Sequence, residues 1–113
     1  MNVGILLCRE LELEPPAAAD TPVAVVADLC HRPAAAADAL HRLGIGRVVL
    51  GLCERPSPEL IGALVRAGAE PFGIEPLILR AHEPEAPQLL AGAVAKLARL
   101  NPNERGKPWP PAA

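Results

Sequence analysis

Short, uninterrupted apolar runs constrain the fold of this chain more than any other feature of its sequence. Three such runs lie within residues 2–8, 23–28 and 47–52, and a weaker one spans 72–80. Uninterrupted runs of this length are typical of strands buried on both faces, whereas alternating apolar and polar residues are typical of a half-exposed sheet. The runs therefore predict four strands of a parallel sheet.

The segments between these runs carry helix signals. Pro33 is suited to the first position of a helix that continues over 34–43 and ends at Gly44. Ser57 is suited to cap a second helix that ends at Gly68, and a third helix is expected over 84–100. The apolar face expected of this third helix comprises Ala86, Leu89, Leu90, Ala93, Val94 and Leu97.

Strands that alternate with helices predict an α/β fold. We expect a three-layer, mostly parallel sheet of about four strands in the order 2-1-3-4, as in flavodoxin-like and Rossmann-like folds. Pro71 and Pro76 place the fourth strand at an edge, because proline cannot donate to a sheet ladder. Residues 1–100 are expected to form a single domain, and the proline-rich segment 101–113, with Trp109, a disordered tail.

The overall charge bears on the class of partner. The chain has 11 lysine and arginine residues against 13 acidic ones, a net charge of −2, which argues against nucleic acid as the main partner. The apolar run Val3 to Cys8 is too short to span a bilayer and lacks the features of a signal peptide. We therefore expect a cytoplasmic protein that does not insert into membranes.

The three cysteines occupy similar positions. Cys8, Cys30 and Cys53 each follow a leucine at the end of an apolar run, and each precedes polar residues. An odd number of cysteines in a cytosolic chain argues against a disulfide framework. Because the carboxyl ends of parallel strands share one edge, we expect the cysteines to line that edge in the order Cys30, Cys8, Cys53.

Three thiolates at one edge are typical of a site for a soft metal, namely an iron–sulfur cluster, zinc or Cu(I). We expect the helix starts after Cys30 and Cys53 to favour thiolates. Arginines on the same rim are expected to add positive charge and to offset that of a cluster; they are Arg9, Arg32 and Arg55. Candidates for a fourth ligand are Glu10, His31, Glu54 and His82. The alternative is that the cysteines simply pack in the core as small apolar residues.

The cysteine-bearing runs also resemble a known family. Val-Gly-Ile-Leu-Leu-Cys8, Val-Val-Ala-Asp-Leu-Cys30 and Gly-Ile-Gly-Arg-Val-Val-Leu-Gly-Leu-Cys53 are similar to the N-terminal domain of the heterodisulfide reductase A subunit. Ala-Gly-Ala-Glu-Pro-Phe over 67–72 resembles its Ala-Gly-Leu-Asn-Pro-Tyr segment, and the match spans about residues 2–83. Members of the family are large iron–sulfur flavoproteins of electron-transfer complexes.

The resemblance implies that the three cysteines ligate an iron–sulfur cluster, such as a 4Fe–4S cluster. Two departures reduce the ligand set. Glu10 and Leu11 replace the second half of the family's Cys-x-Cys-Gly motif. Residues 80–83 align with its Arg-Glu-x-Cys-Ser-Trp motif and bring no cysteine.

The function expected from these features is that of a small electron-transfer subunit that works with a larger oxidoreductase complex. The alternatives are a cofactor-free interaction or regulatory module, which could form a homo-oligomer, and a domain with structural zinc bound by the cysteines and His31. No nucleophile–base pair, carboxylate pair or phosphate loop is specified by spacing, so we do not expect an independent enzyme.

Overall fold

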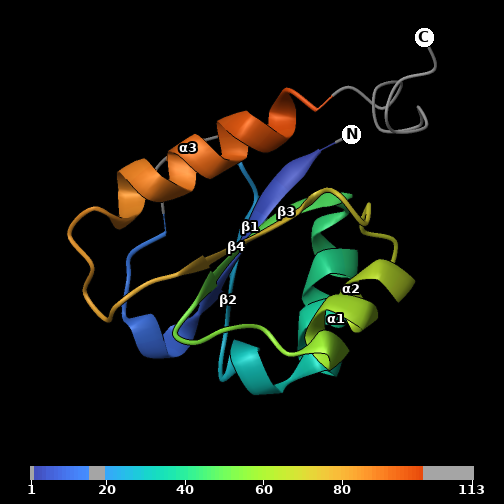
Figure 1. The fold of residues 1–113 in the computed structure, drawn as a ribbon, viewed down its shortest axis with the longest axis horizontal. Helices are drawn as coiled ribbons and strands as arrows, with labels where there is room; N and C mark the ends of the chain where they lie inside the picture. Colours follow the sequence, from blue (N-terminus) through green and yellow to red (C-terminus); the bar gives the residue numbers. More distant parts are fainter. Residues whose placement is uncertain (1, 16–19, 101–113) are drawn as a thin grey trace, which may run out of the picture.

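Residues 2–15 and 20–100 are described by a computed structural model (Figure 1). The tail expected over 101–113, with Trp109, lies outside these residues, as does part of the link between the first two strands.

Four parallel strands form one sheet in the order β2-β1-β3-β4, which confirms the predicted α/β fold and strand order. The strands are β1 (Val3–Cys8), β2 (Val23–Val26), β3 (Arg47–Leu52) and β4 (Ile74–Ile78). Strand β1 is central, and its residue Ile5 pairs with Val23 on one side and with Val49 on the other. The carboxyl end of β1 therefore lies between its two neighbours.

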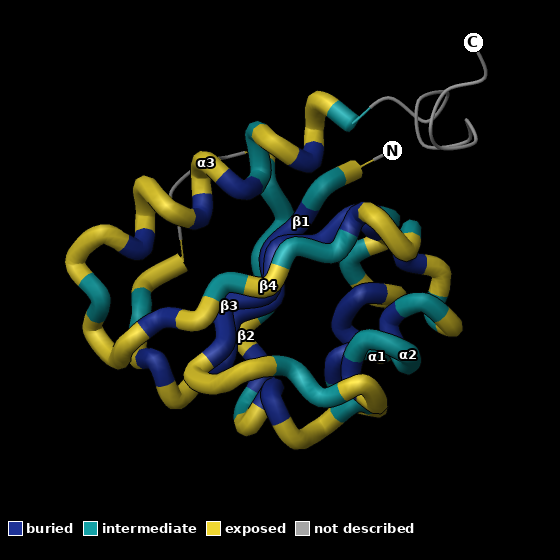
Figure 2. Tube along the Cα trace, in the orientation of Figure 1, coloured by how far each residue is buried: buried dark blue, intermediate teal, exposed yellow. Residues whose placement is uncertain are grey.

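Helices cover both faces of the sheet and give the three expected layers (Figure 1). Helices α1 (Pro33–Leu43) and α2 (Pro58–Arg66) pack against each other on one face. Helix α3 (Ala86–Ala98) lies on the opposite face and contacts β1 and β3. Because these two strands are covered from both sides, every residue of β3 is buried (Figure 2).

The last helix is shorter than the predicted range 84–100, and one side of its apolar face was assigned incorrectly. Leu89 is 42% exposed. The residues of α3 that are buried recur at intervals of three and four, which makes a narrow stripe: Ala86, Leu90, Ala93 and Leu97. Leu89 lies beside this stripe because a single helix against a flat sheet buries less of its circumference than a helix between two layers.

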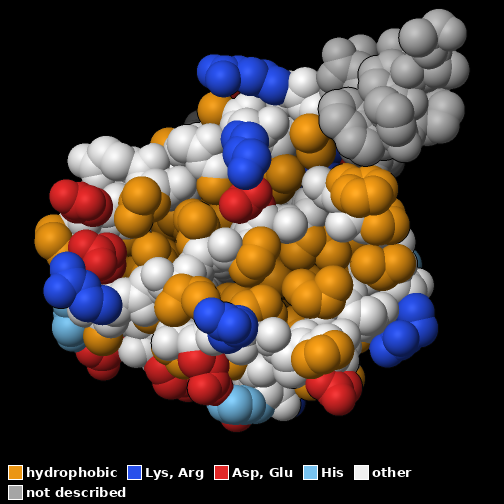
Figure 3. All heavy atoms as spheres, in the orientation of Figure 1, with side chains coloured by type: hydrophobic (Ala, Val, Ile, Leu, Met, Phe, Trp, Pro, Cys, Tyr) orange, Lys and Arg blue, Asp and Glu red, His pale blue; other side chains and the backbone are white. Residues whose placement is uncertain are grey.

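Strand β4 is shorter than the predicted range 72–80 but does lie at an edge of the sheet, since it pairs only with β3. Pro76 fits that position. Apolar side chains remain on the surface over this part of the molecule (Figure 3). Ile78 is 57% exposed and Phe72 71% exposed, so this edge is less well covered than the centre of the sheet.

A buried arginine joins the last helix to the sheet. Arg47, the first residue of β3, is only 4% exposed. Its Nη1 atom donates a hydrogen bond of 2.9 Å to the backbone carbonyl of Leu97, in the last turn of α3, and its Nε atom pairs with the carboxylate of Glu70. A cation at this end of a helix also interacts favourably with the helix dipole.

Helix α2 begins at a side-chain cap close to the cysteine rim, as the sequence predicts. The Ser57 hydroxyl accepts a hydrogen bond of 3.1 Å from the backbone N–H of Leu60. We expect Ser57→Ala to lower the free energy of unfolding by about 1 kcal/mol, because this N–H then loses its side-chain acceptor and keeps only the Ser57 carbonyl. Urea denaturation followed by circular dichroism measures the change. Ser57→Asp, which can cap equally well, should stay close to the wild type.

Within residues 2–15 and 20–100, every helix is too short or too polar to cross a lipid bilayer.

Candidate metal centre

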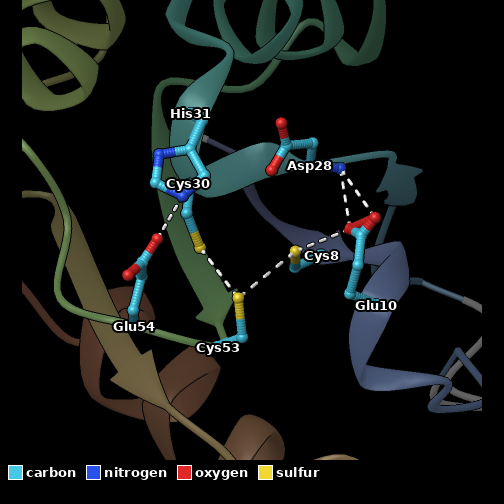
Figure 4. Close-up of polar contacts among 7 residues, drawn as sticks. All are labelled: Cys8, Glu10, Asp28, Cys30, His31, Cys53 and Glu54. Atoms are coloured by element: carbon cyan, nitrogen blue, oxygen red, sulfur yellow. Dashed lines mark hydrogen bonds and ion pairs between the residues drawn. The ribbon is translucent and has the colours of Figure 1, made fainter.

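The fold brings the three cysteines of the chain together at the carboxyl edge of the sheet (Figure 4). The sulfur of Cys53 lies 3.4 Å from that of Cys30 and 3.9 Å from that of Cys8, and all three sulfurs lie within 4.8 Å of one another. All three are free thiols. Their convergence from three separate segments creates a compact group of soft donor atoms.

Each cysteine reaches this group from a different segment of the chain. Cys8 is the last residue of the central strand β1, and Cys53 directly follows β3. Cys30 does not end a strand as predicted: it lies in a 3₁₀ turn, η2 (Leu29–His31), four residues beyond the end of β2. The turn brings Cys30 to Cys53, so the three sulfurs form a triangle and not the predicted row.

The turn depends on Asp28, whose backbone adopts the left-handed conformation, with φ of 53°. Aspartate tolerates this conformation better than most residues. Sequence reasoning did not identify Asp28 as part of the site. The preference of aspartate for left-handed positions was the available signal in the sequence. This preference alone does not predict that the chain turns after β2.

The centre is open on one side. Cys8 and Cys30 are only 2% and 3% exposed, whereas Cys53 is exposed. Two of the sulfurs are therefore shielded by the core, and the third is accessible from solvent.

No family model, curated protein or solved structure matches this chain. The resemblance to the heterodisulfide reductase A subunit remains a prediction, and the centre rests on its own geometry.

Among the predicted fourth ligands, Glu10 is the one in contact with a cysteine sulfur. The thiol of Cys8 lies 3.1 Å from a carboxylate oxygen of Glu10 and donates to it. The same carboxylate accepts hydrogen bonds of 2.7 and 3.2 Å from the backbone N–H of Asp28 (Figure 4). Glu10 thus holds the loop after β1 to the turn that carries Cys30.

The other three candidates pair with side chains outside the sulfur group. His31 pairs with Glu54, and the Nε2 atom of His82 lies 2.6 Å from a carboxylate oxygen of Glu12. Among the described histidines, cysteines and acidic residues, the donor group with atoms mutually within 4.8 Å consists of the three cysteines alone. The described residues thus bring three sulfurs together, and of the predicted fourth ligands only Glu10 contacts one of them.

The three arginines predicted for the rim, Arg9, Arg32 and Arg55, are exposed. Within the part of the chain that the structure describes, their side chains form no hydrogen bond or ion pair. Their role in offsetting the charge of a cluster stays a prediction.

The expectation that the surroundings favour thiolates is wrong for two of the cysteines. Burial raises the pKa of Cys8, and the hydrogen bond with the Glu10 carboxylate raises it further. The hydrogen bond with Cys30 raises the pKa of Cys53 to about 12, with burial adding to the effect. The bond from Cys8 in turn lowers the pKa of Glu10, with help from the Asp28 N–H. Burial and the Glu10 contact at Cys8, and the Cys30 contact with burial at Cys53, thus outweigh the helix starts and the arginines of the rim.

This shift predicts slow alkylation of the exposed Cys53 thiol in the metal-free protein. The pKa of Cys53 rises from 9.0 to about 12. Below pH 9, its thiolate fraction should therefore be about a thousandfold smaller than that of an unperturbed cysteine. At pH 8, we expect iodoacetamide to alkylate Cys53 more slowly than an ordinary cysteine by about this factor. The rate should continue to rise above pH 9, where that of an ordinary cysteine levels off. Peptide mass spectrometry measures the rate. Cys53 in urea-denatured protein is the reference, and equal rates in the two states would contradict the prediction.

The sulfur distances fit a metal centre of small size. With metal–sulfur bonds of about 2.3 Å, tetrahedral geometry separates two sulfurs by about 3.8 Å. The observed separations of 3.4 and 3.9 Å lie on either side of this value. The three cysteines can therefore hold one soft ion with little movement.

Proposed function

We propose that this protein is a small electron-transfer module that holds an iron–sulfur cluster through Cys8, Cys30 and Cys53 and works with a larger oxidoreductase. The observation that carries the proposal is the convergence of three thiols from three separate segments at the open rim of the sheet. Thiolates are the ligands that iron–sulfur clusters use most. The resemblance of the same three segments to an iron–sulfur family supports the same conclusion.

The exposure of Cys53 supports a role in electron transfer. Electrons pass between centres that approach closely, so a redox centre that serves a partner must lie near the surface. Here the core covers Cys8 and Cys30 while Cys53 faces solvent. A partner that docks on this rim would come next to the cluster.

The loop after β3 also gives the site room for a cluster. Each cysteine of a cluster binds a different iron, so the ligand sulfurs of a cluster lie farther apart than those around one ion. The 3.4 Å between Cys30 and Cys53 must therefore increase. Cys53 is the residue able to move outward, because it follows the end of β3 and its side chain is not packed in the core.

A single zinc ion is the second candidate, and the sulfur distances favour it. Separations of 3.4 and 3.9 Å are close to the value of about 3.8 Å for tetrahedral zinc, so these sulfurs would need to move less than for a cluster. Structural zinc sites, however, are closed by four protein ligands. Here the assembled group has three, and His31, the expected fourth, pairs with Glu54.

Metal analysis of anaerobically purified protein tests the proposal. Iron, acid-labile sulfide and zinc are measured per chain, together with a visible spectrum before and after dithionite. Iron and sulfide in matching amounts, with absorption that bleaches on reduction, are the expected result. Zinc alone would identify a structural site. A folded protein that takes up no metal, even after anaerobic reconstitution, would contradict the proposal and favour a cofactor-free interaction module.

A further inference from the structure

We infer that the three thiols also form a receptor for a three-coordinate thiophilic metalloid, for which trivalent arsenic in the form of arsenous acid is the probe. This inference uses the same cysteines as the proposed function, but it does not require that the protein bind a cluster.

The number of donors is the first argument. The group within 4.8 Å consists of three sulfurs, and the Glu10 carboxylate, which contacts the Cys8 sulfur, is not part of it. Zinc requires four ligands in a structural site. Trivalent arsenic is instead satisfied by three sulfurs in a pyramid, with its lone pair in the fourth direction.

The distances are the second argument. A pyramidal centre has bond angles near 100°, and with bonds of about 2.3 Å, as in metal–thiolate sites, this angle separates two sulfurs by about 3.5 Å. The sulfurs of Cys30 and Cys53 are 3.4 Å apart and those of Cys8 and Cys53 are 3.9 Å apart. Two sides of the sulfur triangle are thus close to the required length before anything binds, and the third, between Cys8 and Cys30, is at most 4.8 Å.

The net charge of the complex distinguishes the metalloid from Cu(I), another ion that accepts three thiolates. Three thiolates around Cu(I) leave a charge of −2, whereas three thiolates around trivalent arsenic leave none. A carboxylate oxygen of Glu10 lies 3.1 Å from the sulfur of Cys8. In the described part of the chain, no lysine or arginine donates a hydrogen bond to any of the three sulfurs. Since buried negative charge is costly without a partner, this site favours the neutral product.

Access completes the argument. Cys53 is exposed and can form the first bond, and the buried Cys8 and Cys30 then close around the bound atom. At each thiol an arsenic–oxygen bond breaks, an arsenic–sulfur bond forms, and the thiol proton leaves with the hydroxide as water. Three thiols and one arsenous acid give one tris-thiolate and three waters. The oxidation state of arsenic does not change, so no oxidant or reductant is needed.

Anaerobic titration of the reduced, metal-free protein with arsenous acid tests the inference. The readouts are the near-ultraviolet absorption of arsenic–sulfur bonds, the bound arsenic by native mass spectrometry, and the number of thiols that remain reactive after denaturation at low pH. We expect one arsenic per chain and protection of all three thiols. Cys53→Ser should raise the apparent dissociation constant at least about tenfold, because one of three bonds is lost. Glu59→Gln, an exposed substitution on α2, is the matched control.

The results separate this inference from the proposed function. Three results would each overturn the inference that the three thiols bind arsenic: absence of bound arsenic, protection of only two thiols, or equal affinity in Cys53→Ser and wild type. Iron and sulfide in the purified protein would leave the proposed function standing in any of these cases. If the protein binds arsenic through three thiols but never takes up iron and sulfide, the arsenic site is supported and the proposed iron–sulfur function is refuted.

Discussion

Cys53→Ser is expected to lower the iron and sulfide content of anaerobically purified protein at least about tenfold while leaving the fold intact. Serine offers a hard, weakly acidic hydroxyl in place of a soft thiolate, and iron–sulfur clusters select sulfur. Of the three cysteines, Cys53 is the one whose substitution best separates loss of metal from loss of stability. Its side chain is exposed, whereas Cys8 and Cys30 are in the core, where a hydroxyl would also cost folding energy.

The measurements are iron and sulfide per chain, the visible spectrum and the far-ultraviolet circular dichroism. Glu59→Gln, an exposed change on helix α2, should retain the wild-type content. Wild-type amounts of iron and sulfide in a folded Cys53→Ser protein would remove Cys53 from the ligand set. Loss of metal together with loss of the circular dichroism signal would contradict the expectation that this position is structurally neutral.

Arg47→Met is expected to be the most destabilising single substitution considered for this protein, at about 3–5 kcal/mol. The side chains of Arg47 and Glu70 are 5% and 11% exposed. Methionine fills much of the volume of arginine but removes the cation, which leaves the Glu70 carboxylate in a poorly solvated place without this partner. It also removes the donor of the 2.9 Å hydrogen bond to the Leu97 carbonyl.

Urea denaturation measures the loss, and the double variant Arg47→Met with Glu70→Leu identifies its cause. If uncompensated charge dominates, the double variant should be more stable than Arg47→Met alone, since it removes the carboxylate as well. Arg42→Met removes an exposed i,i+4 pair with Asp38 and should cost less than about 0.5 kcal/mol. A similar cost for Arg42→Met and Arg47→Met would contradict the assigned role of Arg47.

The sequence was sufficient to predict the strand order and the gathering of the cysteines, because both follow from long-range rules about parallel sheets. Uninterrupted apolar runs identified β1 and β3, and Pro76 placed β4 at an edge. The edge strand β4 and helix α3 were each predicted too long. The ends of a partly exposed element depend on which neighbouring elements cover it, and the sequence of the element does not show this. Leu89 illustrates the difficulty: it is apolar and next to buried Leu90, yet it is 42% exposed.

The details of the site could not be predicted, because they depend on a turn. The left-handed Asp28 starts the 3₁₀ turn that carries Cys30 over to Cys53. The same turn presents the N–H that holds Glu10 beside Cys8. Helix starts and arginines, read from the sequence, suggested thiolates. Burial and short contacts instead raise the pKa of Cys8 and Cys53, and both depend on the three-dimensional fold.

Cys8 and Cys53 are 45 residues apart in the chain, and they meet only when β1 and β3 are paired. The unfolded chain therefore has no preformed centre, and any metal that occupies the site adds its binding free energy to the folded state. A ligand at a hundred times its dissociation constant would contribute about 2.7 kcal/mol. For a chain of this size that is a large share of the total stability. The cellular lifetime of the protein would then follow the supply of its metal, since the unloaded chain unfolds more often and is exposed to proteases more often.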